Sequence, residues 1–138
     1  MRPSLARDVL TPLAGEAANR VVLEGPPVKL TSREALSLTM ALSELGTNAI
    51  KYGALSSETG SLSVAWRLKD VSAAQPVLVL EWQERGGPAV QPPTRRGFGT
   101  RLMEGCIERD LNGELDLAFH PDGVVCEISV PVEERRYD

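Results

Sequence analysis

The 138-residue chain has few of the features that mark several large classes of protein. It carries 15 lysines and arginines against 19 aspartates and glutamates, a formal net charge of −4. It contains no basic run dense enough to follow a phosphate backbone, so nucleic acid is not expected as a partner. No apolar run approaches 18 residues, and the N-terminus has no continuous apolar segment. We therefore expect neither a membrane-spanning helix nor a signal peptide.

Cysteine and histidine are equally scarce. Cys106 and Cys126 are too few for a disulfide scaffold and are not spaced as metal ligands, so we expect two reduced, buried thiols in a cytoplasmic domain. His120, the only histidine, stands in a His-Pro-Asp-Gly stretch that is typical of a turn. With 42% hydrophobic residues, residues 1–138 are expected to form one domain with one core, and the charged residues 133–138 to fray.

A helix over residues 31–53 is the best-marked element. Thr31 and Glu34 have the spacing of a capping box, in which each side chain accepts from the other's backbone N–H. Gly53 is expected to end this helix in a left-handed conformation. The apolar residues recur every three or four positions and predict one core-facing stripe, formed by Ala35, Leu38, Leu42, Leu45 and Ala49.

A second stripe of the same helix is polar. Glu44, Asn48 and Lys51 follow at i, i+4 and i+7 and so share a face. Such a triplet is most often a solvated surface with a weak Glu–Lys pair. However, Asn48 is a mediocre helix former, and Gly46 and Thr47 cost the helix about another 1 kcal/mol or more. A helix that accepts these costs in its middle indicates a need for small, polar groups there.

The other segments predict an α+β, two-layer sandwich: a mixed, mostly antiparallel sheet covered on one face by helices. A short amphipathic helix disturbed by Pro12 is expected over residues 4–18, and a short strand over residues 20–24. Alternating or apolar runs predict four further strands, two of them joined by the turn at His120, over residues 61–68, 76–82, 114–119 and 124–130.

Two glycine turns complete a recognisable order of motifs. Trp82-Gln83-Glu84-Arg85-Gly86-Gly87-Pro88 ends one strand, and Gly97-Phe98-Gly99-Thr100-Arg101-Leu102 runs into a helix expected to begin near Thr100. Together with Glu-x3-Asn on the long helix, these motifs resemble the nucleotide pocket of the Bergerat-type ATPases, and more narrowly the ATP-binding domain of the HWE-type bacterial histidine kinases. The resemblance runs from about Leu5 to Val132. One position departs from the family pattern, because Ser43 stands where the family has the histidine before the N-box glutamate.

The resemblance implies a role for each motif. Glu44 would orient or deprotonate the nucleophile, Asn48 would be a Mg²⁺ ligand, and Lys51 would meet phosphate. Glu84 would accept a hydrogen bond from the exocyclic amine of adenine. The ATP-binding set implied in this way is Asn48, Lys51, Tyr52, Glu84, Gly86, Gly87, Arg96, Gly97, Phe98, Gly99, Thr100 and Leu102. For Tyr52, packing along the nucleotide and filling the core are equally compatible with the sequence.

Between the glycine turns, residues 88–96 would form a short, proline-containing ATP lid. Arg95 and Arg96 end it, either near the phosphates or as a solvated basic pair.

The resemblance implies a histidine kinase that uses ATP and Mg²⁺ and donates a phosphoryl group to a histidine on a dimerisation domain, and through it to a response regulator. That helical domain normally precedes this one and is not found in these residues, and His120, in a turn, is not expected to replace its acceptor histidine. Contact with a membrane is not expected, and the isolated domain is expected to be monomeric. The alternative is a regulatory module of the same fold, as in anti-sigma factors, that binds ATP and phosphorylates serine or threonine or only switches a protein partner.

Overall fold

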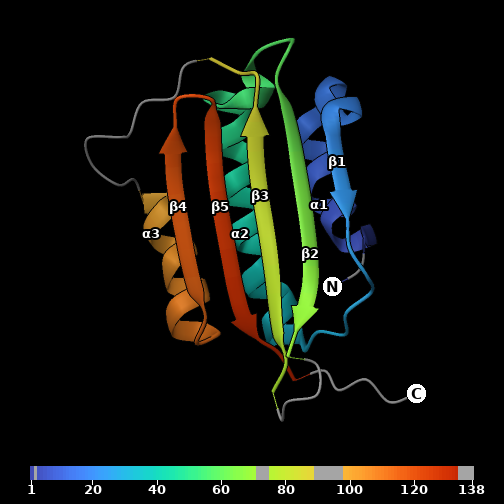
Figure 1. Cartoon of the computed structure of the whole chain (residues 1–138), viewed down its shortest axis with the longest axis vertical. Helices are drawn as coiled ribbons and strands as arrows, with labels where there is room; N and C mark the ends of the chain where they lie inside the picture. The colour runs from blue at the N-terminus through green and yellow to red at the C-terminus, as the bar shows by residue number, and fades with distance from the viewer. Residues whose placement is uncertain (2, 71–74, 89–97, 134–138) are drawn as a thin grey trace.

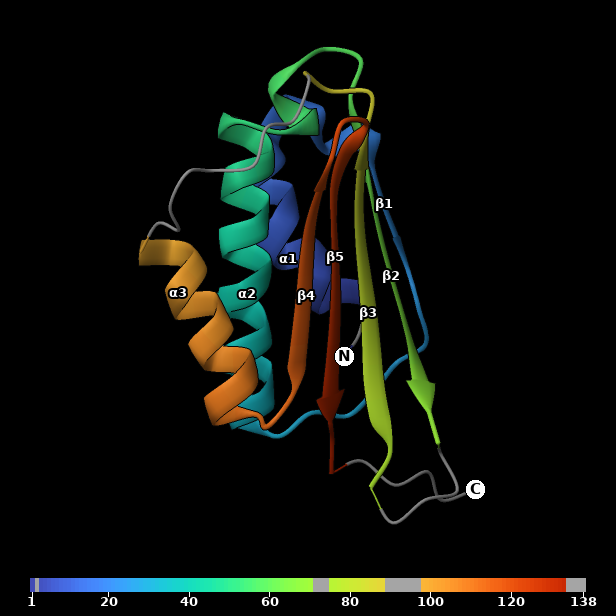
Figure 2. The same cartoon turned by 60° about the vertical axis from the view of Figure 1, so that its left-hand side comes forward.

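A five-stranded sheet and three helices make up the computed structural model, which describes residues 1, 3–70, 75–88 and 98–133. In chain order the elements are α1 (Pro3–Ala14), the 3-10 turn η1 (Gly15–Arg20), β1 (Val21–Glu24), α2 (Ser32–Lys51), the 3-10 turn η2 (Ala54–Ser56), β2 (Ser61–Lys69), β3 (Val77–Arg85), α3 (Phe98–Gly105), the π-helical turn η3 (Cys106–Asp110), β4 (Glu114–His120) and β5 (Gly123–Pro131). The sheet lies in front of the helices in Figure 1, and the two layers are seen edge-on in Figure 2. The expected α+β sandwich is confirmed.

The strand order is β1-β2-β3-β5-β4, with β1 parallel to β2 and every other pair antiparallel. Side chains of a strand alternate between faces, and the register aligns the buried ones across the sheet. Leu62 pairs with Glu84, and Trp82 with Cys126, so these side chains share the face that packs on the helices. Their sequence neighbours, such as Gln83 and Arg85, therefore belong to the uncovered face.

Helix α2 is held at its start by the predicted capping box. The Thr31 N–H donates to Glu34 Oε1 at 2.9 Å, and the Glu34 N–H donates to Thr31 Oγ1 at 3.1 Å. The other oxygen, Glu34 Oε2, accepts from the Glu133 N–H at 3.2 Å, which ties the helix to the end of the sheet. The predicted stripe faces the core: four of its five members are buried, and Ala35 is half-buried.

The end of α2 differs from the prediction. Lys51 is the last helical residue, and Gly53 has φ −104°, which is not the left-handed conformation expected of it. Glycine is required here for a steric reason, because a Cβ at Gly53 would lie 2.1 Å from Glu84 Oε1 and 3.0 Å from the Ala49 Cα. The glycine lies just beyond the end of the helix, and the reason predicted for it, a left-handed backbone, is wrong.

The remaining elements agree closely with the sequence. Pro12 lies within α1 without ending it, and the helix stops two residues later, before Gly15 with φ +55°. Both cysteines are free and buried, as expected. Strand β3 is longer than predicted and contains Glu84, which therefore does not follow the strand. No helix among the described residues is long and apolar enough to cross a membrane. The frayed end expected over residues 133–138 lies, apart from Glu133, outside the described residues.

Candidate functional site

The polar stripe of α2 forms a hydrogen-bonded pair. Asn48 Nδ2 donates to Glu44 Oε2 at 2.8 Å, and both side chains are half-buried. Because the amide nitrogen is turned to Glu44, the carboxamide oxygen is the Asn48 atom left to meet a cation. Lys51 lies exposed in the last helical turn. Tyr52 is 73% exposed, so core filling, one of the two roles considered for it, is wrong.

A second carboxylate is buried on β3, beside the segment that follows α2. Glu84 is 3% exposed and points from β3 toward the helices. Its Oε1 accepts from the Ala54 N–H at 2.9 Å, and its Oε2 accepts from Trp82 Nε1 at 2.9 Å. Burial raises the pKa of Glu84, and the two hydrogen bonds partly oppose that rise because they favour the ionised form.

The first glycine turn closes on the same segment. Gly86 has φ +75°, a conformation that side chains rarely adopt. A Cβ at Gly87 would lie 2.4 Å from the Ala54 Cα, so backbone meets backbone at this point. Gly87 is therefore required by its close contact with the Ala54 backbone, and Gly86 by its backbone conformation.

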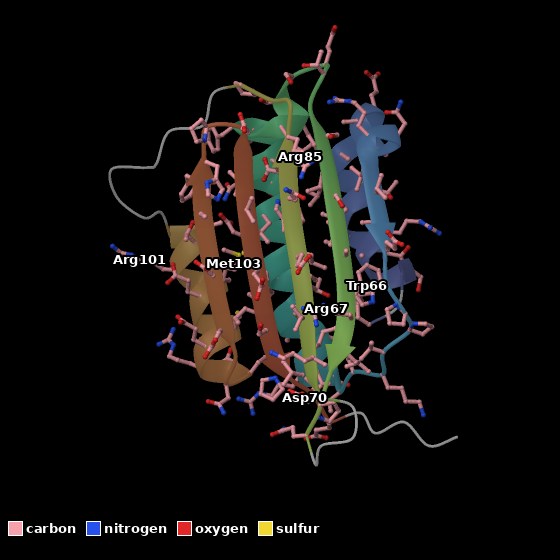
Figure 3. The ribbon with its side chains drawn as sticks, in the orientation of Figure 1. Trp66, Arg67, Asp70, Arg85, Arg101 and Met103 are labelled. Atoms are coloured by element: carbon pink, nitrogen blue, oxygen red, sulfur yellow. The ribbon has the colours of Figure 1, made fainter. Side chains whose placement is uncertain are left out.

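The second glycine motif differs from the expectation. Helix α3 begins at Phe98, before Thr100, so Gly99 lies in its first turn. A Cβ at Gly99 would lie 2.1 Å from Glu44 Oε1, which brings this motif directly against the N-box pair. Thr100 is half-buried, Leu102 is 43% exposed, and Arg101 extends outward from α3 in Figure 3. Arg95, Arg96, Gly97 and the lid fall outside the described residues.

The two carboxylate clusters are joined by the end of α2. The backbone oxygen of Asn48 accepts from the N–H groups of Tyr52 at 2.8 Å and Gly53 at 3.0 Å. The next N–H, that of Ala54, donates to Glu84. Backbone hydrogen bonds around Tyr52 and Gly53 thus connect Asn48, the candidate metal ligand, to Glu84, the candidate adenine-binding carboxylate.

An open pocket of about 560 Å³ adjoins this region on the uncovered face of the sheet. It shares Glu84, Gly86 and Gly87 with the candidate site, and its other lining residues include Gln83, Arg85 and His120. Glu44 and Asn48 are not among its lining residues. The motifs therefore converge on the opposite, helix-facing side of β3.

The arrangement suits a nucleotide better than a metal bound by protein alone. The described residues contain no group of three His, Cys, Asp or Glu side chains that could hold a metal ion. Mg²⁺ keeps several waters and often takes one or two protein oxygens beside substrate phosphates, and the Asn48 oxygen fits that need. His120 is exposed at the end of β4, opposite Gly123, and is not on a helix, as expected from its sequence.

Comparison with solved structures identifies the fold, although no family profile matches the chain. The catalytic domain of histidine kinase ThkA superposes with a TM-score of 0.68 at 16% identity, covering 94% of this chain and 92% of that one. The histidine kinase domain from the Erythrobacter litoralis EL346 blue-light activated histidine kinase gives 0.67 at 20% identity, covering 93% and 59%. The chain has the fold of a histidine-kinase catalytic domain.

Its sequence places it more closely. The chain is homologous to blue-light-activated histidine kinases, with 37% identity over 128 residues to that of Brucella anthropi and 34% over 123 residues to that of Brucella ovis. These alignments cover 93% and 89% of the chain but only 26% and 25% of the relatives, so the chain spans about a quarter of their length. The assignment to the histidine kinases made from the motifs is confirmed.

Two groups that contact Glu84 were not expected at the site from the sequence. Gly53 makes room for Glu84, and the Ala54 N–H binds it, 30 positions away in the chain. No local sequence pattern predicts contacts between residues so far apart in the chain. The bond from Trp82 did have a signal, because residues two apart in a strand share a face.

Proposed function

We propose that this chain binds Mg-ATP and donates the γ-phosphoryl group to a histidine on a separate domain or chain, from which a response regulator receives it. The observation that carries the proposal is the convergence of three motifs on α2: the Glu44–Asn48 pair, the adjoining Gly99, and the buried Glu84 bound at the helix end. The homology to histidine kinases supports the same reaction.

At the phosphate end, Glu44 is the candidate base. Its carboxylate would orient or deprotonate the attacking group, and its bond to Asn48 turns the carboxamide oxygen outward. When bound, Mg²⁺ would neutralise phosphate charge, with Asn48 as a protein ligand. Lys51 and the amides at the start of α3 would add positive potential; Gly97, Phe98, Gly99, Thr100, Leu102 and Arg96 are proposed around the phosphates from the motif alone.

At the adenine end of the site, Glu84 would accept a hydrogen bond from the exocyclic amine of adenine. A carboxylate bonds an amine strongly and repels the carbonyl that guanine has at this position, so adenine is favoured. Gly86 and Gly87 would let the chain approach the base, and Tyr52, being exposed, is free to pack along the nucleotide.

Nucleotide binding can be tested with the chain as it is. ATP with Mg²⁺ should raise the melting temperature by mass action, and GTP should raise it much less. Asn48→Ala should weaken the magnesium-dependent part of the shift. Equal shifts with ATP and GTP would remove Glu84 from base recognition, and no shift with any nucleotide would contradict the proposed site.

Transfer needs an acceptor. His120 lies at a hairpin of the chain's own sheet and not on a helix, so we do not expect its imidazole to take the in-line position about 3–3.5 Å from phosphorus. Incubated with labelled ATP, the chain should stay unlabelled; added helical, histidine-bearing domain from a related kinase should take up acid-labile label. Acid-labile label on His120, abolished by His120→Ala, would contradict the proposal. Acid-stable label on a partner's serine would instead support a regulatory kinase.

A further inference from the structure

Trp82 is bonded to the carboxylate that we propose reads adenine. The two side chains lie two residues apart on the helix-facing side of β3, and the indole Nε1–H donates to Glu84 Oε2 at 2.9 Å. Trp82 is fully buried, with 0% of its side chain exposed. An indole N–H can only donate, so it pairs with an oxygen and never with a donor.

Glu84 is fixed from the other side as well. Its Oε1 accepts from the Ala54 N–H. The same oxygen lies so close to Gly53 that a Cβ at that position would collide with it. Leu62, its partner across β2, is apolar and buried. Trp82 and Ala54 are the hydrogen-bonding groups that act on the pKa of Glu84, and both are neutral donors. Among the residues that the structure describes, the carboxylate is therefore oriented by two donors, neither of which is a cation.

We propose that Trp82 is a positioning residue for base specificity: by donating to Oε2 it holds the Glu84 carboxylate in the one orientation that can accept from the amine of adenine. The inference rests on the proposed function. A glutamate side chain has several rotatable bonds, and a donor on each oxygen restricts their rotation more than a single donor would. Without the indole N–H, the side chain can turn, or take up a proton and present a donor that tolerates guanine.

Trp66 provides a matched control within the same core. It is 4% exposed on β2, opposite Leu80, and its Nε1 donates to the Pro26 oxygen at 2.7 Å (Figure 3). Trp66→Phe thus removes a buried indole and one hydrogen bond from the neighbouring strand without touching Glu84. Any loss common to Trp66→Phe and Trp82→Phe reports packing, and any excess in Trp82→Phe reports the carboxylate.

The experiment measures ATP and GTP affinity of the wild type and both variants between pH 5 and 8. The ATP-to-GTP preference should fall about tenfold or more in Trp82→Phe, the usual effect of losing a bond to a charged group, and stay unchanged in Trp66→Phe. A lost donor raises the pKa of Glu84 further, so the fall in ATP affinity on acidification should begin at higher pH in Trp82→Phe alone.

A spectroscopic measurement covers the case in which Trp82→Phe does not fold. The chain has two tryptophans, hence two indole N–H signals in an NMR spectrum, which Trp66→Phe assigns. The Trp82 signal should shift on addition of ATP and titrate with Glu84, whereas the Trp66 signal should do neither. Replacing Trp82 by 3-benzothienylalanine, which keeps the ring shape without the N–H, should reproduce the loss of preference.

The outcomes separate this inference from the proposed function. A wild type that binds no nucleotide contradicts the function itself. A wild type that prefers ATP, with the same preference in Trp82→Phe or in the benzothienyl protein and an indole signal indifferent to ATP, overturns the role of Trp82 alone.

Discussion

The two carboxylates at the ends of the proposed nucleotide site are held in opposite ways. Glu44 is half-buried on α2 and bonds Asn48 one turn along the same helix. Glu84 is buried on β3 and bonds a strand neighbour and a backbone N–H 30 residues away. The first cluster is local and near solvent, so it can change without disturbing the fold. The second is tertiary and dry, so the proposed base specificity and the stability of the fold depend on the same contacts.

The largest expected effect is on chemistry, at the local cluster. Glu44→Ala should cut phosphoryl transfer to an added histidine-bearing domain by about 10²-fold or more, because it removes the proposed base. Nucleotide binding should persist, and the free energy of unfolding should change by about 1 kcal/mol or less, the cost of one partly exposed hydrogen bond. The control is Glu108→Ala, at an exposed glutamate of η3, which should leave transfer unchanged. Binding lost while transfer per bound ATP is kept would exchange the roles assigned to Glu44 and Asn48.

The next largest effect is on the fold, at the tertiary cluster. Gly53→Ala puts a Cβ against Glu84 Oε1 and the Ala49 backbone, neither of which can move away cheaply. We expect a loss of about 1–3 kcal/mol in urea unfolding and a weakened ATP shift. Gly46→Ala, whose Cβ would meet the flexible ends of Leu10 and Leu13 at 2.9 and 3.1 Å, should cost less. Equal losses would mean that Glu84 is not as tightly held as its contacts indicate.

Gly99→Ala tests the same intrusion at the local cluster. The new Cβ would again lie 2.1 Å from a carboxylate oxygen, but the half-buried Glu44 side chain can turn toward solvent. Stability should change little, since alanine also favours the helix by up to about 1 kcal/mol. Transfer should fall because the displaced carboxylate leaves Asn48. A variant as unstable as Gly53→Ala would remove the contrast between the two sites.

The smallest effect is a pH dependence. Burial raises the folded-state pKa of Glu84 above the usual 4.5, so the folded state binds the proton more tightly than the unfolded state. The resulting stabilisation of the folded state is complete below the pKa of Glu84 in the unfolded chain. It is lost as the pH rises through the pKa of Glu84 in the folded state. Glu84→Gln should flatten this part of the stability curve measured by denaturant unfolding, and Glu81→Gln, exposed on the same strand, should not.

The contrast also explains what the sequence could predict. Spacing along one helix revealed the capping box, the core stripe and the Glu44–Asn48 pair, because all of these contacts are local. Alternation revealed the strands and the hairpin at His120. The sequence could not predict why glycine is needed at positions 53 and 99. In each case a side chain would collide with a carboxylate from another element of the fold. The placement of Gly99 within α3 shows the same limit, since a Gly-x-Gly motif alone does not say where a helix begins.

The bond between Glu34 and the Glu133 N–H has a consequence for the order of events during synthesis. The Thr31 half of the cap can form as soon as α2 leaves the ribosome, but the second oxygen of Glu34 waits for a residue 99 positions later. β5 also inserts between β3 and β4, so the sheet closes only when it arrives. A nascent chain halted before β5 would carry α2 without its bond to the end of the sheet, and should be open to proteases until the last strand docks.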